Sequence, residues 1–222
     1  GHNFRDFGGY PTIDGGRVRR GLLFRSGLMS HLTAEDEDRL RGLDIATICD
    51  LRTRAERDER PTRWLGDDGD LLFDDDTEAT TTLRALIERG DASEAEGRAA
   101  MVALYGELPF KHRTMYRTMF RRLIDGRVPL LVNCSAGKDR TGVAAALVLR
   151  ALGVAPEVIE RDFLVTARAL DAEVLRTADL AGAQAVVSGA LSSAELVRKT
   201  RELLRSHVLP YELPRLPRVT AP

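Results

Sequence analysis

The chain has 222 residues, of which 43% are hydrophobic and 30% charged, and its formal net charge is −1. This length can bury a core without disulfides or metals, and the balanced charge gives no overall attraction to nucleic acid. Because there are only two cysteines, a disulfide framework is excluded and a reducing, cytoplasmic location is expected. No apolar run suits an integral membrane helix and no secretory signal is evident, although secretion without a signal stays open.

The first half of the chain predicts a strand, a helix and a second strand. Short apolar runs at 22–25 and 45–49 have strand length. Between them, Thr33 is placed to cap a helix over 34–41, which Gly42 ends. This alternation is typical of a parallel sheet whose faces are covered by helices.

The middle of the chain gives a weaker pattern. Acidic residues between 67 and 76 indicate an exposed loop. The segment that follows reads as helical but interrupted by Gly90 and Gly97, so 77–106 is predicted to be a lid or an insertion. The residues over 112–124 then repeat an apolar face at helical spacing.

The second half predicts a buried strand at 129–132, a tight turn, and a helix over 140–152. Another helix is expected from Pro156 to about 169, followed by further helices and an irregular tail over 210–222. The whole chain, 1–222, is therefore expected to form one α/β domain with a central, mostly parallel sheet flanked by helices.

The turn between that strand and helix carries the chemistry. It begins at Cys134 and ends at Arg140. Successive backbone N–H groups in such a turn can form a nest for an anion, and the following helix adds its own free N–H groups. Gly137 allows a backbone conformation that a side chain would obstruct. The expected phosphate-binding residues are Ser135, Ala136, Gly137, Lys138, Asp139 and Arg140.

This environment favours the thiolate of Cys134, which can attack phosphorus and form a covalent intermediate. Arg140 can close its planar fork on two phosphate oxygens. Thr141 is placed to donate a hydrogen bond to the sulfur and help it leave. A buried cysteine without function remains the alternative, since a bare Cys-x5-Arg spacing often arises by chance.

The run from Asn133 to Gly142 resembles the Cys-x5-Arg protein tyrosine phosphatase superfamily. It is similar to bacterial tyrosine/serine and phosphoinositide phosphatases with the loop His-Cys-x-Ala-Gly-Lys-Asp-Arg-Thr-Gly. The resemblance covers about 3–61 and 105–165, and its further matches are Asn3-Phe4-Arg5-Asp6, Gly8-Gly9-Tyr10, Leu23-Phe24-Arg25-Ser26, Asp50-Leu51-Arg52, Glu56 and Arg60-Pro61. It implies a hydrolase of phosphorylated proteins or phosphoinositides that needs no cofactor or metal.

The chain departs from this family at one position, where Asn133 replaces the usual histidine. The histidine is thought to orient the loop and support the thiolate. Asparagine can donate a hydrogen bond but carries no charge. Reduced but surviving activity is expected, and a phosphate-binding pseudophosphatase is the rival interpretation.

The resemblance also implies an aspartic acid that protonates the leaving oxygen. Asp139 within the loop is one candidate, Asp75 or Asp76 in the acidic stretch is another, and Asp50 at a strand end is a third. A sulfur transferase of the rhodanese type also uses a loop cysteine before a helix, but the Gly-Lys-Asp-Arg-Thr-Gly run argues against it.

Several further charged or reactive residues, within the turn and outside it, have more than one possible role. Lys138 either recognises inositol lipids, as the resemblance suggests, or neutralises Asp139. Cys49 is expected to be a small buried hydrophobe, with a protective disulfide to Cys134 as the alternative. The remaining charged residues are expected to form ion pairs that brace the turn (Arg5, Asp6, Arg25, Asp50 and Arg52) or a solvated stripe with a smaller chance of membrane contact (Arg113, Arg117 and Arg121).

Overall fold

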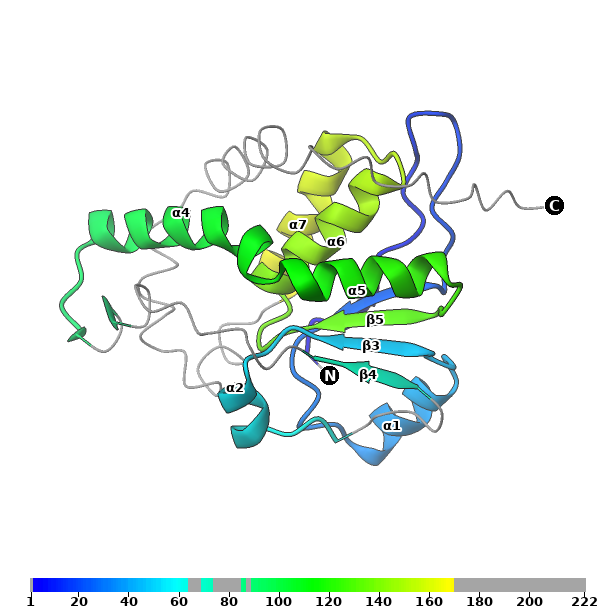
Figure 1. Cartoon of the computed structure of the whole chain (residues 1–222), viewed down its shortest axis with the longest axis horizontal. Coiled ribbons are helices and arrows are strands. Elements are labelled where there is room, and N and C mark those ends of the chain that lie inside the picture. The colour runs from blue at the N-terminus through cyan, green and yellow to red at the C-terminus, as the bar shows by residue number, and fades with distance from the viewer. Residues whose placement is uncertain (1, 64–68, 74–84, 87–88, 170–222) are drawn as a thin grey trace.

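A five-stranded sheet forms the centre of the protein in a computed structural model that describes residues 2–63, 69–73, 85–86 and 89–169 (Figure 1). The strand order is β1-β2-β5-β3-β4. The strands are β1 Arg5–Asp6, β2 Leu23–Ser26, β3 Thr47–Asp50, β4 Asp70–Leu72 and β5 Leu130–Asn133. Strands β2, β5, β3 and β4 run parallel, and β1 pairs with β2 in the antiparallel sense. The predicted α/β fold with a mostly parallel sheet is confirmed.

The helices cover both faces of this sheet. They are α1 Ala34–Arg41, α2 Arg54–Glu59, α4 Glu94–Lys111, α5 Arg113–Ile124, α6 Asp139–Ala151 and α7 Pro156–Ala169. In Figure 1, α4 to α7 lie above the sheet and α1 lies below it. None of the helices in the described part of the chain is both long and apolar enough to cross a membrane.

The central strand β5 shows why two layers of helices are needed. Its side chains alternate between the faces, as strand geometry requires. Leu130 and Val132 pack into the larger apolar cluster with α4 to α7, whereas Leu131 packs into a second cluster with Leu40 of α1. Both faces of β5 are therefore buried, which explains its unbroken apolar sequence.

The middle of the chain differs from the prediction. Helix α4 continues through Gly97, whose N–H donates to the Ser93 carbonyl at 2.9 Å. Ser93 and Glu96 form a capping box, and Met101 and Tyr105 are buried in the core. Capping and burial together exceed the roughly 1 kcal/mol cost of a helical glycine.

Residues 94–106 consequently belong to one continuous helix, and the interruption expected at Gly97 is absent. The expectation that 77–106 forms a lid or an insertion stays a prediction. Residues 77–84, 87–88 and the tail 210–222 lie outside the described residues. Two boundaries also move: β5 includes Asn133, and α6 begins at Asp139 rather than at Arg140. The predicted helix caps at Thr33 and Gly42 are confirmed.

Candidate active site

The cysteine loop lies at the carboxyl edge of the sheet. Strand β5 ends at Asn133 and α6 begins at Asp139, so Cys134 is the first residue of the connecting turn. Strands β2 and β3 end at the same level, with Ser26 and Asp50 as the register partners of Asn133. Ligands of open parallel sheets bind at this edge, beyond the strand ends.

The carbonyl groups of the loop are fixed from outside it. Three of them accept hydrogen bonds from segments that precede β5: Leu28 N to Ser135 O (2.9 Å), Asn3 Nδ2 to Ala136 O (3.2 Å) and Gly137 O (3.0 Å), and Arg25 NH2 to Gly137 O (3.0 Å). In a trans peptide the N–H points opposite to the carbonyl of the same unit. The amide groups of the turn are therefore directed to the side away from these donors, as an anion nest requires.

Gly137 occupies the position where the turn approaches β2 most closely. Its φ is +67°, in the left-handed region. A Cβ at this position would lie 2.4 Å from the Ser26 carbonyl oxygen and 2.5 Å from the Gly27 nitrogen. A side chain would therefore displace the loop, which confirms the reason for expecting glycine here.

A buried ion pair between β2 and α7 supports the loop. Arg25, fully buried on β2, places NH1 2.6 Å from Asp162 Oδ2 on α7, while its NH2 reaches the loop. Burial, followed by the charge of Arg25, lowers the pKa of Arg5 to about 10. Asp6 accepts from the backbone N–H groups of Gly8 and Gly21. The bracing role expected of Arg25 is confirmed, but its partner Asp162 has no local sequence signal.

Arg140 is held by a carboxylate from a different helix. Its NH1 and NH2 each lie 2.6 Å from one oxygen of Glu56 on α2, and NH1 also donates to the Leu51 carbonyl at 3.0 Å. A guanidinium has five N–H donors in a planar fork. Glu56 therefore takes the edge formed by NH1 and NH2, and NH2 also donates to the Ser135 hydroxyl oxygen at 3.4 Å.

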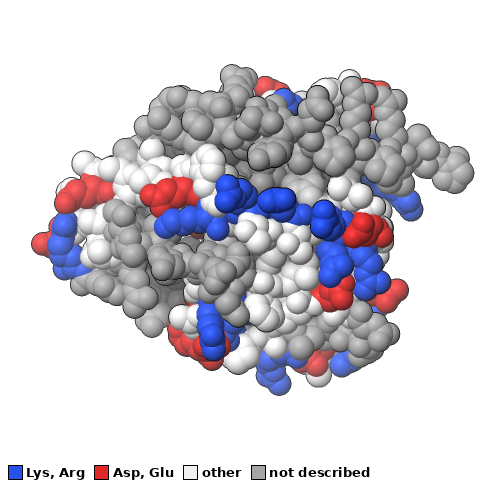
Figure 2. Space-filling view, in the orientation of Figure 1, with Lys and Arg blue, Asp and Glu red and all other residues white. Residues whose placement is uncertain are grey.

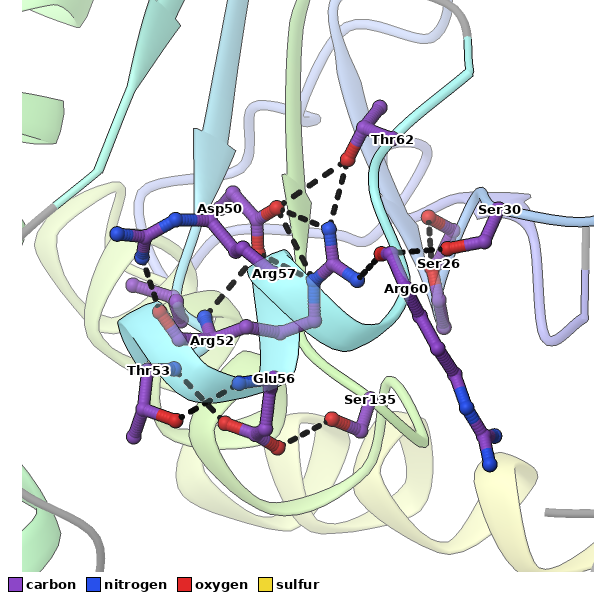
Figure 3. Close-up of polar contacts among 12 residues, drawn as sticks. Ser26, Ser30, Asp50, Arg52, Thr53, Glu56, Arg57, Arg60, Thr62 and Ser135 are labelled. Atoms are coloured by element: carbon purple, nitrogen blue, oxygen red, sulfur yellow. Dashed lines mark hydrogen bonds and ion pairs between the residues drawn. The ribbon is translucent and has the colours of Figure 1, made fainter.

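Glu56 connects α2, the loop and Arg140. It completes a capping box with Thr53, whose N–H donates to Glu56 Oε2 at 2.8 Å, and the Ser135 hydroxyl donates to its other oxygen. Figure 3 shows the carboxylate between Thr53 and Ser135. Burial opposes ionisation of Glu56, but the hydrogen bond and charge of Arg140 outweigh it and lower its pKa to about 2. The capping sequence Thr-x-x-Glu marks Glu56 as a helix start, and its contact with Arg140 was not anticipated.

The four candidate aspartates for the general acid differ in what the structure shows of them. Asp50 is 1% exposed and accepts three hydrogen bonds from the Arg52 side chain, at 2.6 to 3.1 Å, and one from Thr62 (Figure 3). Its oxygens are thus occupied by structural contacts, as the bracing role predicts. Asp75 and Asp76 lie outside the described residues.

Asp139 begins α6 and is contacted from two sides. Lys138 Nζ lies 2.7 Å from Asp139 Oδ1, and the hydroxyl of Tyr105 on α4 donates to the same oxygen. Burial raises the pKa of Asp139, but the charge and hydrogen bond of Lys138, the Tyr105 bond and the charge of Arg140 hold it below its usual value. Tyr105 was not anticipated, because its only sequence signal is a place on the apolar face of a helix.

Two buried polar side chains beside the cysteine have no hydrogen-bond partner among the described residues. They are Asn133, at both Oδ1 and Nδ2, and Thr141, at Oγ1. Cys134 itself is 2% exposed. The hydrogen bond expected from Thr141 to the sulfur is not formed here, and the Asn133 amide, which can donate one, makes none among the described residues. Buried polar groups usually find partners, so both are available to a bound ligand or a rearranged loop.

The two cysteines are not bridged. Cys49 on β3 lies opposite Val132, two residues before Cys134. Strand spacing and rise place two such Cα atoms about 8 Å apart, beyond the roughly 7 Å limit for a disulfide. Burial raises the pKa of the Cys49 thiol to about 12, as for a small buried hydrophobe.

The sequence of this chain is similar to those of known phosphatases. The family model described as "Tyrosine phosphatase family" matches residues 1–208. A Cupriavidus necator protein named as a tyrosine-protein phosphatase is 36% identical over 163 residues, which are 73% of this chain and 59% of that protein. The triple specificity protein phosphatase PtpB of Mycobacterium tuberculosis is 34% identical over 186 residues, covering 73% of this chain and 65% of PtpB.

Among solved structures, P. aeruginosa TpbA in complex with pTyr matches with 18% identity and a TM-score of 0.36, over 83% of this chain and 89% of that one. The chain spans about three fifths of the length of the two named relatives. Because the family model covers nearly the whole sequence, this chain belongs to the tyrosine phosphatase family.

Proposed function

We propose that this chain hydrolyses phosphate monoesters through a cysteinyl-phosphate intermediate on Cys134. Two features of the site together support this most strongly. The loop carbonyls are bonded by residues outside the loop, and Glu56 holds the guanidinium of Arg140 in place. Amide N–H groups and a guanidinium then face the same anion, next to a cysteine at the carboxyl edge of the sheet. This is the arrangement that phosphoryl transfer needs, because positioning and charge stabilisation supply most of its catalysis.

In the proposed reaction the Cys134 thiolate attacks phosphorus in line. The S–P bond forms as the bond to the ester oxygen breaks, and Asp139 gives a proton to that oxygen. Asp139 then takes a proton from water, which attacks phosphorus and releases inorganic phosphate and the thiolate. Ser135 to Arg140 bind the phosphate throughout. Thr141 donates its unpartnered hydroxyl hydrogen to the sulfur as it leaves.

Tyr105→Phe tests the role of Asp139 through the pH profile. Removing the Tyr105 hydroxyl removes one of the groups that lower the Asp139 pKa. Because a general acid must be protonated to act, the basic limb of kcat should move to higher pH, by about half a unit to one unit for a lost hydrogen bond. The measurement is kcat against pH for an alkyl phosphate, whose poor leaving group depends on protonation.

Tyr116→Phe is the matched control. Tyr116 is equally buried, but its hydroxyl donates to the Arg140 backbone carbonyl, at 3.2 Å, rather than to Asp139. The basic limb should stay in place in this variant. An unchanged limb in both variants would remove Asp139 from the role of acid.

Phosphotyrosine in proteins is the proposed first substrate, with phosphoserine and phosphoinositides as further candidates. The relative PtpB is named a triple specificity phosphatase, which supports a broad range. Lys138 is engaged with Asp139, so the structure favours neutralisation over recognition of inositol lipids. The proposal includes no cofactor, and no cluster of metal-binding side chains occurs in the described residues.

One observation favours a second candidate function, a phosphate-binding pseudophosphatase. Asn133 stands where the family has histidine, and its amide makes no hydrogen bond within the described part of the chain. The loop thus lacks the support that the family's histidine is thought to give. Phosphate binding would survive this loss, because the amides and Arg140 remain.

The deciding experiment is turnover of three substrates by the wild-type chain: a phosphotyrosine peptide, a phosphoserine peptide and a phosphoinositide in vesicles. We expect stoichiometric release of phosphate from the phosphotyrosine peptide, and its rate relative to the others defines the specificity. Tight binding of the peptide without release of phosphate from any substrate would establish the pseudophosphatase instead.

A further inference from the structure

A row of arginines lies on α5, outside the site described above. The helix buries Met115 and Met119 toward the sheet. On its exposed side, arginines follow one another at four-residue intervals: Arg113, Arg117 and Arg121. In Figure 2 positive side chains form a band that runs along α5. Residues four apart in a helix are surface neighbours, so their charges add locally.

Part of this row lines a pocket. A cavity of about 350 Å³ is bordered, among the described residues, by Thr114, Arg117, Thr118, Arg121 and Arg122. This volume falls at the lower end of small-molecule sites, which span about 300–1,000 Å³. The described lining consists of guanidinium and hydroxyl groups, with neither a carboxylate nor an aromatic ring. We call it the arginine pocket.

The positive charge of the arginine pocket is poorly balanced. Helix α5 contains no acidic residue. In residues 2–63, 69–73, 85–86 and 89–169, neither Arg117 nor Arg121 forms an ion pair. Arg122 Nε lies 3.5 Å from Asp70 Oδ2, and Arg127 NH2 lies at the same distance from that oxygen. One half-exposed carboxylate thus serves two guanidiniums, so the charges of the described residues around the pocket add up to a net positive charge.

We propose that the arginine pocket binds a polyanion with clustered phosphate groups. Planar guanidinium forks pair with two oxygens of one phosphate, and the Thr114 hydroxyl can donate to a third. The Thr118 hydroxyl donates to the Thr114 carbonyl, at 3.1 Å. Three arginines around so small a volume fit a densely charged ligand better than a single carboxylate. Without an aromatic ring on which a base could stack, the described lining favours a polyphosphate or an inositol polyphosphate over a nucleotide. Binding of this ligand would not require hydrolysis at Cys134.

Helix α5 connects the arginine pocket to the loop. Tyr116, on the same helix as the arginine pocket, donates its hydroxyl to the Arg140 carbonyl at 3.2 Å. A ligand that fixes α5 would therefore act on an element that directly contacts the proposed phosphate site. The arginine pocket and the loop nevertheless use different residues, so each can be removed by mutation while the other is kept.

The test is calorimetric titration of the chain with tripolyphosphate and with a soluble inositol polyphosphate at fixed ionic strength. The wild type should show a binding event besides any at the phosphate loop. In Arg117→Gln/Arg121→Gln that event should weaken by about 10- to 100-fold, because two charge-assisted contacts are lost. Both side chains are exposed, so the fold should be kept.

The matched control is Arg39→Gln/Arg41→Gln on α1, which changes the net charge equally at two exposed arginines that are ion-paired with Glu35 and Asp38. Equal affinities in the two double variants would overturn the proposal, since they would show only general charge attraction. Tighter binding of the inositol compound would identify a headgroup as the ligand, and tighter binding of tripolyphosphate would identify a free chain. Binding to phosphoinositide vesicles alone, with neither soluble ligand bound, would also overturn it.

Discussion

Cys134→Ser should reduce turnover of a phosphotyrosine peptide by roughly 10⁴-fold or more, because a hydroxyl cannot replace the thiolate nucleophile. The substitution leaves the loop amides, Arg140 and Glu56 in place. The variant should therefore still bind the phosphopeptide, with an affinity within a few-fold of the wild-type KM. Initial rates give the first quantity, and equilibrium binding of the intact phosphopeptide gives the second.

Cys49→Ser is the matched control for this experiment. Cys49 is buried in the same apolar cluster as Cys134, but it lies on β3 away from the loop. Its replacement should lower the free energy of unfolding by about 1–3 kcal/mol, since an unpaired hydroxyl would be buried. The kcat of the folded protein should be retained. Substantial turnover by Cys134→Ser, or loss of kcat in Cys49→Ser alone, would contradict the assignment of the nucleophile.

Glu56→Gln should lower kcat/KM by about 100-fold through the orientation of Arg140. The carboxylate now accepts from both terminal nitrogens of that guanidinium. An amide would place an NH₂ donor against one of them, so Arg140 would lose its alignment while keeping its charge. Steady-state kinetics on the phosphotyrosine peptide measure this effect. Glu59→Gln, at the exposed end of α2, should leave kcat/KM unchanged.

The free energies of unfolding of Glu56→Gln and Glu59→Gln should also depend differently on pH. The pKa of Glu56 is about 2 in the folded chain, against an ordinary value of 4.5. Ionised Glu56 therefore stabilises the fold fully above about pH 4.5, and this contribution is lost as the pH falls toward 2. The shift corresponds to about 3 kcal/mol, which we reduce to about 2 kcal/mol because the side chain is 32% exposed.

Urea unfolding between pH 7 and pH 2 tests this contribution. The stability difference between wild type and Glu56→Gln should be large at neutral pH and shrink by about 2 kcal/mol on acidification. In Glu59→Gln the difference from wild type should stay small throughout. A constant gap between wild type and Glu56→Gln would mean that the ion pair with Arg140 contributes nothing specific to the fold.

Much of the fold follows from local patterns. The apolar runs that became β2, β3 and β5 are each short, and their alternation with capped helices indicates parallel pairing. Thr33 and Gly42 bound α1 as predicted, because caps depend on residues only a few positions apart. The prediction was wrong where tertiary contacts dominate: α4 runs through Gly97, since burial of Met101 and Tyr105 outweighs the local preference of glycine.

In the candidate site, too, some features could be predicted from the sequence and others could not. The residues of the turn from Cys134 to Arg140 are adjacent in sequence, so their placement between a strand and a helix could be predicted. The partners that hold them could not. Glu56 reaches Arg140 across 84 positions, and Asp162 reaches Arg25 across 137.

The sequence by itself determined a cysteine-containing turn between a strand and a helix, a mostly parallel sheet and membership of the tyrosine phosphatase family, because each depends on residues close together in the chain. Only the tertiary structure decided which side chains surround that turn: Glu56 on Arg140, Tyr105 on Asp139, and Asp162 behind Arg25. These contacts form where separate helices meet at one edge of the sheet. Their geometry depends on packing over long sequence distances, which no local pattern encodes.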